Sequence, residues 1–171
     1  WEGDSLVLEL TVAPGSDPEE VQRWQLRCGD VRKVRFDETY GDRISLHDSH
    51  ILLEPHVGSW AALYFNGRPT NVDAVIGQLW LAHQQLTQNW IPFVTYLNMS
   101  SRLEALIAAG NGLLADGPRR VLDDYAAVLG RNNMNPNLQK ERDATYWNGE
   151  RWIPEPRDLH VLILGEVSYV V

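Results

Sequence analysis

Cysteine is nearly absent from this sequence, since Cys28 is the only one in 171 residues. A single thiol excludes a disulfide within the chain and a zinc site built from several cysteines of one chain. Long apolar runs are absent too, because none approaches the roughly 20 residues of a membrane-spanning helix. No basic segment followed by an apolar one opens the chain as a secretion signal would. We therefore expect a cytoplasmic protein with no membrane partner.

Basic residues are also scarce. The sequence holds 15 lysines and arginines against 23 aspartates and glutamates, a formal net charge of −8. Binding to a phosphate backbone depends on Lys and Arg, so this balance predicts no nucleic-acid partner. Hydrophobic residues make up 44% of the chain, which is enough for a packed core and excludes a disordered protein.

Motifs that bind cofactors or metals are missing. The HExxH, paired CxxC and EF-hand spacings do not occur. Residues 110–117 are rich in glycine, but they lack the Lys-Ser/Thr pair of a P-loop, and Ala115 stands where a dinucleotide-binding motif has its third glycine. We interpret these glycines as flanking a helix end, and we expect no cofactor and no bound metal.

The first part of the chain predicts strands over residues 5–12, 44–54 and 60–65, with the last two paired to each other. Each of these runs is rich in apolar residues and ends at a turn signal. Residues 44–54 carry apolar side chains on both faces, which is typical of a strand near the middle of a sheet.

Residues 23–36 predict a hairpin whose register depends on the loop length. A two-residue loop would set Leu26 opposite Lys33, which mixes apolar and polar side chains on both faces. A three-residue loop at 29–31 sets Leu26 opposite Val34 and Trp24 opposite Phe36 instead. Only this second register leaves one face apolar and the other polar, so we predict it.

Helical spacing begins after residue 70. The capping box Thr70-x-x-Asp73 predicts a helix over 71–88. A second box, Ser101-x-x-Glu104, predicts a short helix that ends at Gly110. A third helix is expected from Pro118 to Gly130, since proline suits a first turn and glycine a helix end.

Three further segments complete the predicted fold. Residues 131–143 read as a polar surface loop and residues 146–152 as a tight hairpin with a type I′ turn at Asn148-Gly149. Residues 159–171 read as a buried strand, with a break at Gly165 as the alternative. No internal repeat or composition break marks a boundary. We predict a single globular α+β domain over residues 1–171, with one antiparallel sheet of about six strands and two or three helices packed on one face.

The predicted core is one cluster of apolar side chains from these elements. Truncation of Trp80 to Ala should then cost about 3–5 kcal/mol, as for other buried aromatic side chains. The expected members are Trp24, Leu26, Val34, Phe36, Leu46, Leu52, Leu63, Ile76, Leu79, Trp80, Leu122, Tyr125, Leu129, Val161 and Ile163.

The densest group of reactive side chains is His47, Asp48, Ser49 and His50. On a strand, Ser49 and His47 share one face, as a nucleophile and its base require, but Asp48 points to the other face. This incomplete arrangement makes the four residues weak catalytic candidates. A metal site would combine Asp48 and His50 with a histidine brought in by the fold, His56 or His83.

Charge is nearly absent from the middle of the chain. The charged residues within 61–110 are only Arg68, Asp73, Arg102 and Glu104. Helix 71–88 carries glutamines where a solvated helix usually carries Lys and Glu. Two explanations stay open, internal burial of this helix and a contact surface for another protein or a second copy of the chain. The contact residues would be Gln84, Gln85, Gln88 and Trp90.

Trp147 and Trp152 flank the expected Asn148-Gly149 turn and are candidates for an exposed aromatic contact. Because no catalytic constellation is complete, the sequence favours a non-enzymatic protein-binding domain. An immunity or antitoxin-like acidic protein for a basic partner is one such function. The alternative is a hydrolase or metal-assisted enzyme that uses residues 47–50.

Overall fold

The structure is a computed structural model that describes residues 5–12, 21–29, 31, 33–35, 44–155, 158–164 and 167–170. Its architecture is α+β, but the described strands form several antiparallel sheets, so the prediction of one six-stranded sheet is wrong. The chain divides into two compact units, residues 1–49 with 159–171 and residues 50–158. The single domain over residues 1–171 stays a prediction. Among the described residues, no helix is both long enough and apolar enough to cross a membrane.

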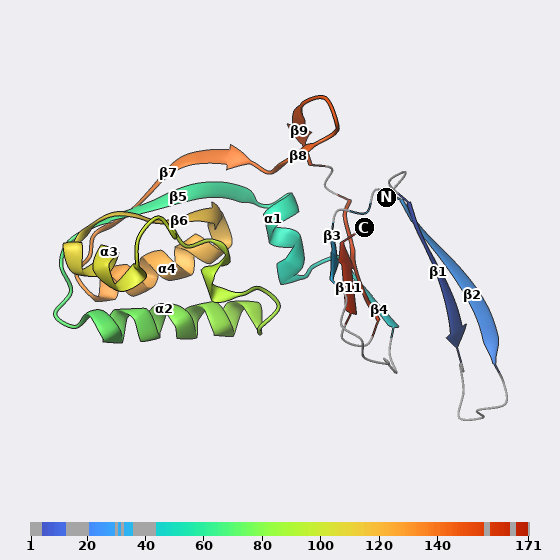
Figure 1. The fold of residues 1–171 in the computed structure, drawn as a ribbon, viewed down its shortest axis with the longest axis horizontal. Helices are drawn as coiled ribbons and strands as arrows, with labels where there is room; N and C mark the ends of the chain where they lie inside the picture. Colours follow the sequence, from blue (N-terminus) through green and yellow to red (C-terminus); the bar gives the residue numbers. More distant parts are fainter. Residues whose placement is uncertain are drawn as a thin grey trace. The chain divides into compact units, whose positions relative to one another are not determined.

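The unit 50–158 is built on a three-stranded antiparallel sheet in the order β6-β5-β7 (Figure 1). Its strands are β5 (Ser59–Asn66), β6 (Asn111–Pro118) and β7 (Pro136–Asp143). β5 confirms the strand predicted at 60–65. Its predicted partner is wrong, because β5 pairs with β6 and β7 and not with residues 44–54.

Two predicted segments form strands instead. The glycine-rich stretch, predicted to flank a helix end, forms β6, and the predicted surface loop forms β7. β7 is an edge strand with mostly exposed side chains, so it carries no apolar alternation that would predict a strand. In β6, a Cβ on Gly117 would lie 2.7 Å from the ring of Tyr96. This glycine therefore permits a close approach within a strand and does not mark a helix end.

Four α-helices lie in this part of the described chain. They are α1 (Glu54–Val57), α2 (Val72–Thr87), α3 (Leu103–Ala109) and α4 (Arg119–Arg131). The three longer ones confirm the helices predicted at 71–88, before Gly110 and after Pro118. α4 packs against all three strands, and α2 packs against α4 and α3. α2 is thus the outermost layer on this face of the sheet (Figure 1).

Both predicted capping boxes are wrong. Asn71, not Thr70, is the N-cap of α2, and its side-chain oxygen accepts a hydrogen bond from the amide of Ala74 at 3.0 Å. Arg102 is the N-cap of α3, and no side chain caps this helix. The end of α3 is as predicted, since Gly110 adopts a φ of 81° that favours glycine.

The predicted core is confirmed in part. The predicted burial is wrong for three side chains, because Trp24, Leu46 and Trp80 are 46%, 61% and 47% exposed. Phe36 and the side chain of Val34 lie outside what the structure describes. The half-buried members are Leu26, Ile76 and Ile163. The buried members are Leu52, Leu63, Leu79, Leu122, Tyr125, Leu129 and Val161.

Residues 1–49 and 159–171 contain a four-stranded antiparallel sheet in the order β3-β11-β10-β4. Its strands are β3 (Lys33–Arg35), β4 (Ile44–His47), β10 (Val161–Leu164) and β11 (Val167–Val170). An unbroken strand over 159–171 is wrong, because β10 and β11 are separate strands that pair with each other. β10 ends at Leu164 and β11 begins at Val167, which agrees with the predicted alternative of a break at Gly165. The strand predicted over 44–54 is also too long: it ends at His47, and a 3₁₀ turn follows at Ile51–Leu53.

β1 (Ser5–Val12) and β2 (Gln22–Gly29) form a two-stranded antiparallel sheet. The hairpin predicted over 23–36 is therefore wrong, since Leu26 lies opposite Leu8 and Trp24 opposite Leu10. The observed register also sets apolar residues against apolar ones. The prediction required a register in which one face is apolar and the other polar. Pairing with β1 meets this requirement, but the prediction did not consider β1 as the partner.

β8 (Thr145–Trp147) and β9 (Trp152–Pro154) confirm the hairpin predicted at 146–152. Trp147 pairs with Trp152, so the connection has four residues and not the two of a type I′ turn. The side-chain oxygen of Asn148 accepts hydrogen bonds from the amides of Glu150 and Arg151, which closes this longer turn.

Candidate functional site

The segment 47–50 does not form the strand that the sequence predicts. The Nε2 atom of His47 lies 2.9 Å from the hydroxyl oxygen of Ser45, two residues back on β4. Ser49 follows the strand end and is exposed. The hydroxyl group beside His47 is therefore that of Ser45. Sequence reasoning missed this residue, although alternate residues of one strand do share a face.

Asp48 contacts His160, for which the sequence gives no partner signal. The Nδ1 atom of His160 lies 2.8 Å from a carboxylate oxygen of Asp48, whose side chain is 85% exposed. Exposed ion pairs contribute little to stability, and a protonated histidine is needed for this one to be ionic. Asp48 thus contacts the residue that precedes β10 and not His50, with which the sequence predicts that it shares a strand face.

His50 and Trp90 contact each other within the unit 50–158. The Nδ1 atom of His50 accepts a hydrogen bond from the amide of Leu52 at 3.2 Å and so caps the 3₁₀ turn. Its ring meets the ring of Trp90 edge-on, at 5.1 Å between centroids. Both side chains are half-buried. Within the described residues, no group of three or more His, Cys, Asp or Glu side chains could hold a metal ion.

His83 is fully buried on α2 and is held at both ring nitrogens. Its Nε2 atom lies 2.7 Å from the carbonyl oxygen of Ile91, and its Nδ1 atom lies 2.8 Å from the Tyr125 hydroxyl. A carbonyl only accepts, so Nε2 donates and Nδ1 accepts the Tyr125 proton. Burial lowers the pKa of His83, and the hydrogen bond to Ile91 opposes that shift. Burial thus favours the neutral form of this imidazole.

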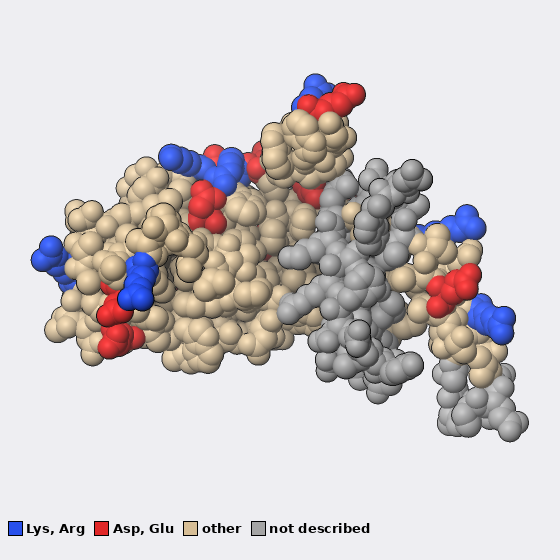
Figure 2. Space-filling view, in the orientation of Figure 1, with Lys and Arg blue, Asp and Glu red and all other residues tan. Residues whose placement is uncertain are grey.

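The outward side of α2 is the first candidate binding surface. We call it the α2 outer face, and it is exposed or half-exposed throughout. Figure 2 shows an uncharged surface over the middle and the C-terminal end of α2, whereas charged side chains gather over β7. Its members are Ala74, Gly77, Trp80, Leu81, Gln84, Gln85 and Gln88.

The exposed positions of α4 provide an internal comparison. α4 exposes Arg120, Asp123, Asp124 and Arg131 together with two small residues. Among the six exposed positions within α2, only Asp73 is charged. Because both helices belong to one unit, the lack of charge is a property of α2 and not of the unit as a whole.

The second candidate surface is the tryptophan hairpin, β8 and β9. Trp147 and Trp152 are 53% and 66% exposed, and their rings meet at 5.8 Å between centroids with an interplanar angle of 62°. The structure thus brings together the two tryptophans that flank the turn. Large exposed aromatic rings are frequent anchors of binding surfaces.

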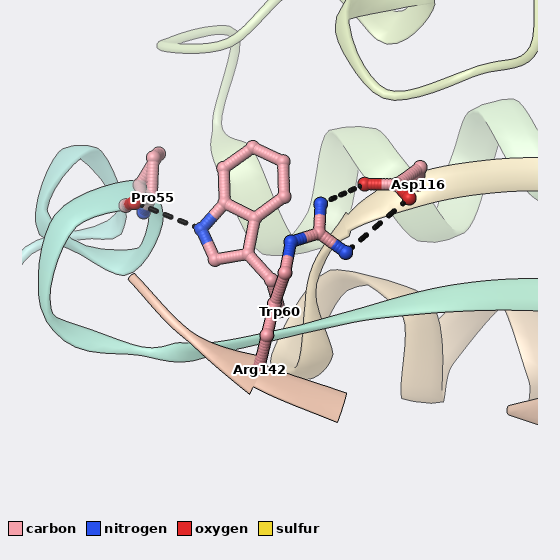
Figure 3. A network of polar contacts seen from close by, with 4 residues as sticks. All are labelled: Pro55, Trp60, Asp116 and Arg142. Atoms are coloured by element: carbon pink, nitrogen blue, oxygen red, sulfur yellow. Dashed lines mark hydrogen bonds and ion pairs between the residues drawn. The ribbon is translucent and has the colours of Figure 1, made fainter. Parts of the chain in front are cut away.

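Figure 3 shows a polar network of Pro55, Trp60, Asp116 and Arg142. The guanidinium group of Arg142 lies over the ring of Trp60 at 5.3 Å and bonds a carboxylate oxygen of Asp116 at 2.6 Å. The indole nitrogen of Trp60 donates to the carbonyl oxygen of Pro55 at 2.9 Å. Sequence reasoning missed Arg142 because it assigned β7 to a loop.

The network borders a pocket of about 300 Å³. Its walls include Trp60, Arg142, Asp143, Thr145 and Trp152. In the same unit, the Nδ1 atom of His56 lies 3.1 Å from a carboxylate oxygen of Glu155, whose side chain is only 2% exposed.

Comparison with protein-family models, with curated proteins and with solved structures finds no match to this chain. Its function therefore has to be inferred from the geometry of these surfaces.

Proposed function

We propose that this chain is a non-enzymatic protein-binding domain that recognises another protein through the α2 outer face. The observation that carries the proposal is the exposure of Trp80 and Leu81, 47% and 52%, on a helix whose only charged exposed residue is Asp73 in its first turn. Desolvation of a charged side chain is costly, so surfaces that a partner covers tend to lose charge. The exposed side of α4 carries charged residues, as expected of a helix surface that only water contacts. The exposed side of α2 differs from it in this respect.

A basic protein is the partner that the charge of the chain favours. The net charge of −8 attracts a basic partner and speeds the encounter, whereas two copies of this chain repel each other. An immunity or antitoxin-like protein is an acidic protein of this kind, since it binds and neutralises a basic protein.

A hydrolase is the alternative function, and the contact between Ser45 and His47 supports it. Nucleophilic catalysis needs such a hydroxyl–imidazole pair, together with a group that orients the imidazole and donors for the developing oxyanion. The neighbouring carboxylate, Asp48, contacts His160. The binding function therefore has the stronger support.

The experiment that tests the proposal adds charge to the α2 outer face. Gln84→Glu/Gln88→Glu is compared with Gln139→Glu, which makes the same change at an exposed position of β7. Both proteins are used to capture binding partners, which are quantified by mass spectrometry. Because a buried unpaired carboxylate costs about 1–3 kcal/mol or more, we expect recovery of basic partners to fall about tenfold or more in the double variant. Gln139→Glu should retain them.

Thermal melting and sedimentation complete this test. The melting temperature of the double variant should match that of the wild type, because its two side chains are not core. Equal recovery of partners by the double variant would contradict the proposal, and so would its unfolding. A change confined to self-association would identify the partner as a second copy of the chain.

A further inference from the structure

The pocket between β7 and the tryptophan hairpin has no role in the function proposed above, since none of its residues belongs to α2. Its volume of about 300 Å³ lies at the lower end of the range of small-molecule sites, roughly 300–1,000 Å³. This volume suits a ligand of about one six-membered ring with its substituents.

One wall of the pocket is held in place before any ligand arrives. Trp60 is fixed by its hydrogen bond to the Pro55 carbonyl oxygen and by the guanidinium group of Arg142 over its ring (Figure 3). Arg142 is itself held by two contacts to the Asp116 carboxylate, at 2.6 and 3.4 Å. Such preorganisation lowers the entropy that binding costs.

The pocket lining also offers two polar side chains, those of Asp143 and Thr145. Asp143 and Thr145 are exposed, and their side chains make no hydrogen bond within the part of the chain that the structure describes. Trp152 adds an indole ring that is 66% exposed. A ligand therefore meets a carboxylate acceptor, a hydroxyl group and a flat apolar ring at the same time.

These groups select the chemistry of the ligand. An anion would be repelled by Asp143, and a cation would be repelled by Arg142. A neutral ring with several hydroxyl groups is compatible with both, because each hydroxyl donates to a carboxylate or accepts from a guanidinium group. A pyranose ring also has a flat face of C–H groups that packs on an indole ring.

We propose that this pocket binds one ring of a neutral saccharide, with Trp152 stacked on the sugar and Asp143 and Arg142 on its hydroxyl groups. Trp147 extends the aromatic surface beyond the pocket, since its ring lies 5.8 Å from that of Trp152. A second sugar ring of an oligosaccharide would meet Trp147.

Titration of the full chain with trisaccharides tests this site. The neutral probes are maltotriose, cellotriose and triacetylchitotriose, and the charged controls are the cationic glucosamine trimer and the anionic galacturonate trimer. Binding is measured by calorimetry and by NMR shifts of the tryptophan indole N–H signals. We expect saturable binding of at least one neutral probe at millimolar concentration, with a shift of the Trp152 signal.

Variants assign that binding to the pocket. Trp152→Ala and Asp143→Ala should each weaken it about tenfold, which is the effect of losing one stacking or charged hydrogen-bonding group. Trp80→Ala removes a similarly exposed indole outside the pocket and should leave it unchanged. Asp143 is exposed, so its variant keeps the test open if Trp152→Ala unfolds.

Three results would overturn the proposal. These are the absence of binding by every neutral probe, binding of a charged trimer as tight as that of the neutral ones, and equal weakening by Trp80→Ala. Loss of partner capture in the α2 variants has no bearing on these titrations, so the two proposals fail independently.

Discussion

The buried imidazole of His83 links the stability of this protein to pH. Its two ring nitrogens contact the Ile91 carbonyl oxygen and the Tyr125 hydroxyl, and in the neutral ring Nε2 donates to the first and Nδ1 accepts from the second. Burial lowers the pKa of His83 from its ordinary value of 6.5. Protonation would place a positive charge in a fully buried site, which is unfavourable even where the Tyr125 hydroxyl turns to accept the second ring proton.

We expect the free energy of unfolding to fall as the pH drops below 6.5. Above 6.5, His83 is neutral in both the folded and the unfolded chain and has no effect on pH dependence. Below 6.5, the unfolded chain binds a proton that the folded chain does not. The loss from this residue is up to about 1.4 kcal/mol per pH unit, until the pH reaches the lowered folded-state pKa.

Urea unfolding between about pH 7 and pH 5 measures this effect, because it spans the ordinary histidine pKa. His83→Gln serves as the control, since its amide still donates to Ile91 but does not titrate. The variant should be less stable at neutral pH and should lose less stability on acidification than the wild type. Parallel pH profiles of the two proteins would contradict the assignment.

The same residue explains why the buried side of α2 was only partly predictable. Apolar spacing locates the helix and the buried positions Val75 and Leu79. The stripe then continues through His83 and Thr87, which are polar and carry no hydrophobic signal. The helical spacing of apolar residues also predicts Trp80 in the core, yet adjacent helical residues point about 100° apart, and of Leu79 and Trp80 only Leu79 is buried.

The orientation of α2 reverses the expectation for Trp80. Because its side chain is 47% exposed, Trp80→Ala should cost about 1 kcal/mol or less and not the 3–5 kcal/mol of a core tryptophan. Leu79→Ala, one residue away and fully buried, should cost about 2–5 kcal/mol. Chemical denaturation of the two variants measures both costs. Equal costs would mean that Trp80 packs in the core.

The strands show where local patterns stop being informative. β5 is central, buries residues on both faces, such as Ala62 and Leu63, and is predicted from its apolar sequence. β7 lies at an edge, where a charged segment such as Lys140–Arg142 is compatible with a strand because only the backbone has to pair. β2 has the predicted two-faced pattern, but the choice of β1 as its partner is set by contacts that a local pattern does not contain.

Charge is unevenly divided along the whole chain. Residues 1–49 and 159–171 hold six basic and twelve acidic residues, whereas residues 50–158 hold nine and eleven. Most of the net charge therefore belongs to one unit, and the uncharged α2 outer face belongs to the other. In the proposed function, the first unit supplies long-range attraction for a basic partner and the second supplies the contact.

The unit 50–158 is continuous in sequence, and this leads to a prediction for the molecule as a whole. It contains its own three-stranded sheet, the helices that cover it, and fully buried side chains such as Leu63, Leu79 and Leu122. A segment with its own core is able to fold alone. We expect residues 50–158, produced separately, to unfold cooperatively and to show protected amides in β5 by hydrogen exchange. Leu79→Ala in this segment should lower its melting temperature, because the lost core contact lies inside it. A segment without protected amides would instead favour the single domain that the sequence predicts, whose halves fold only together.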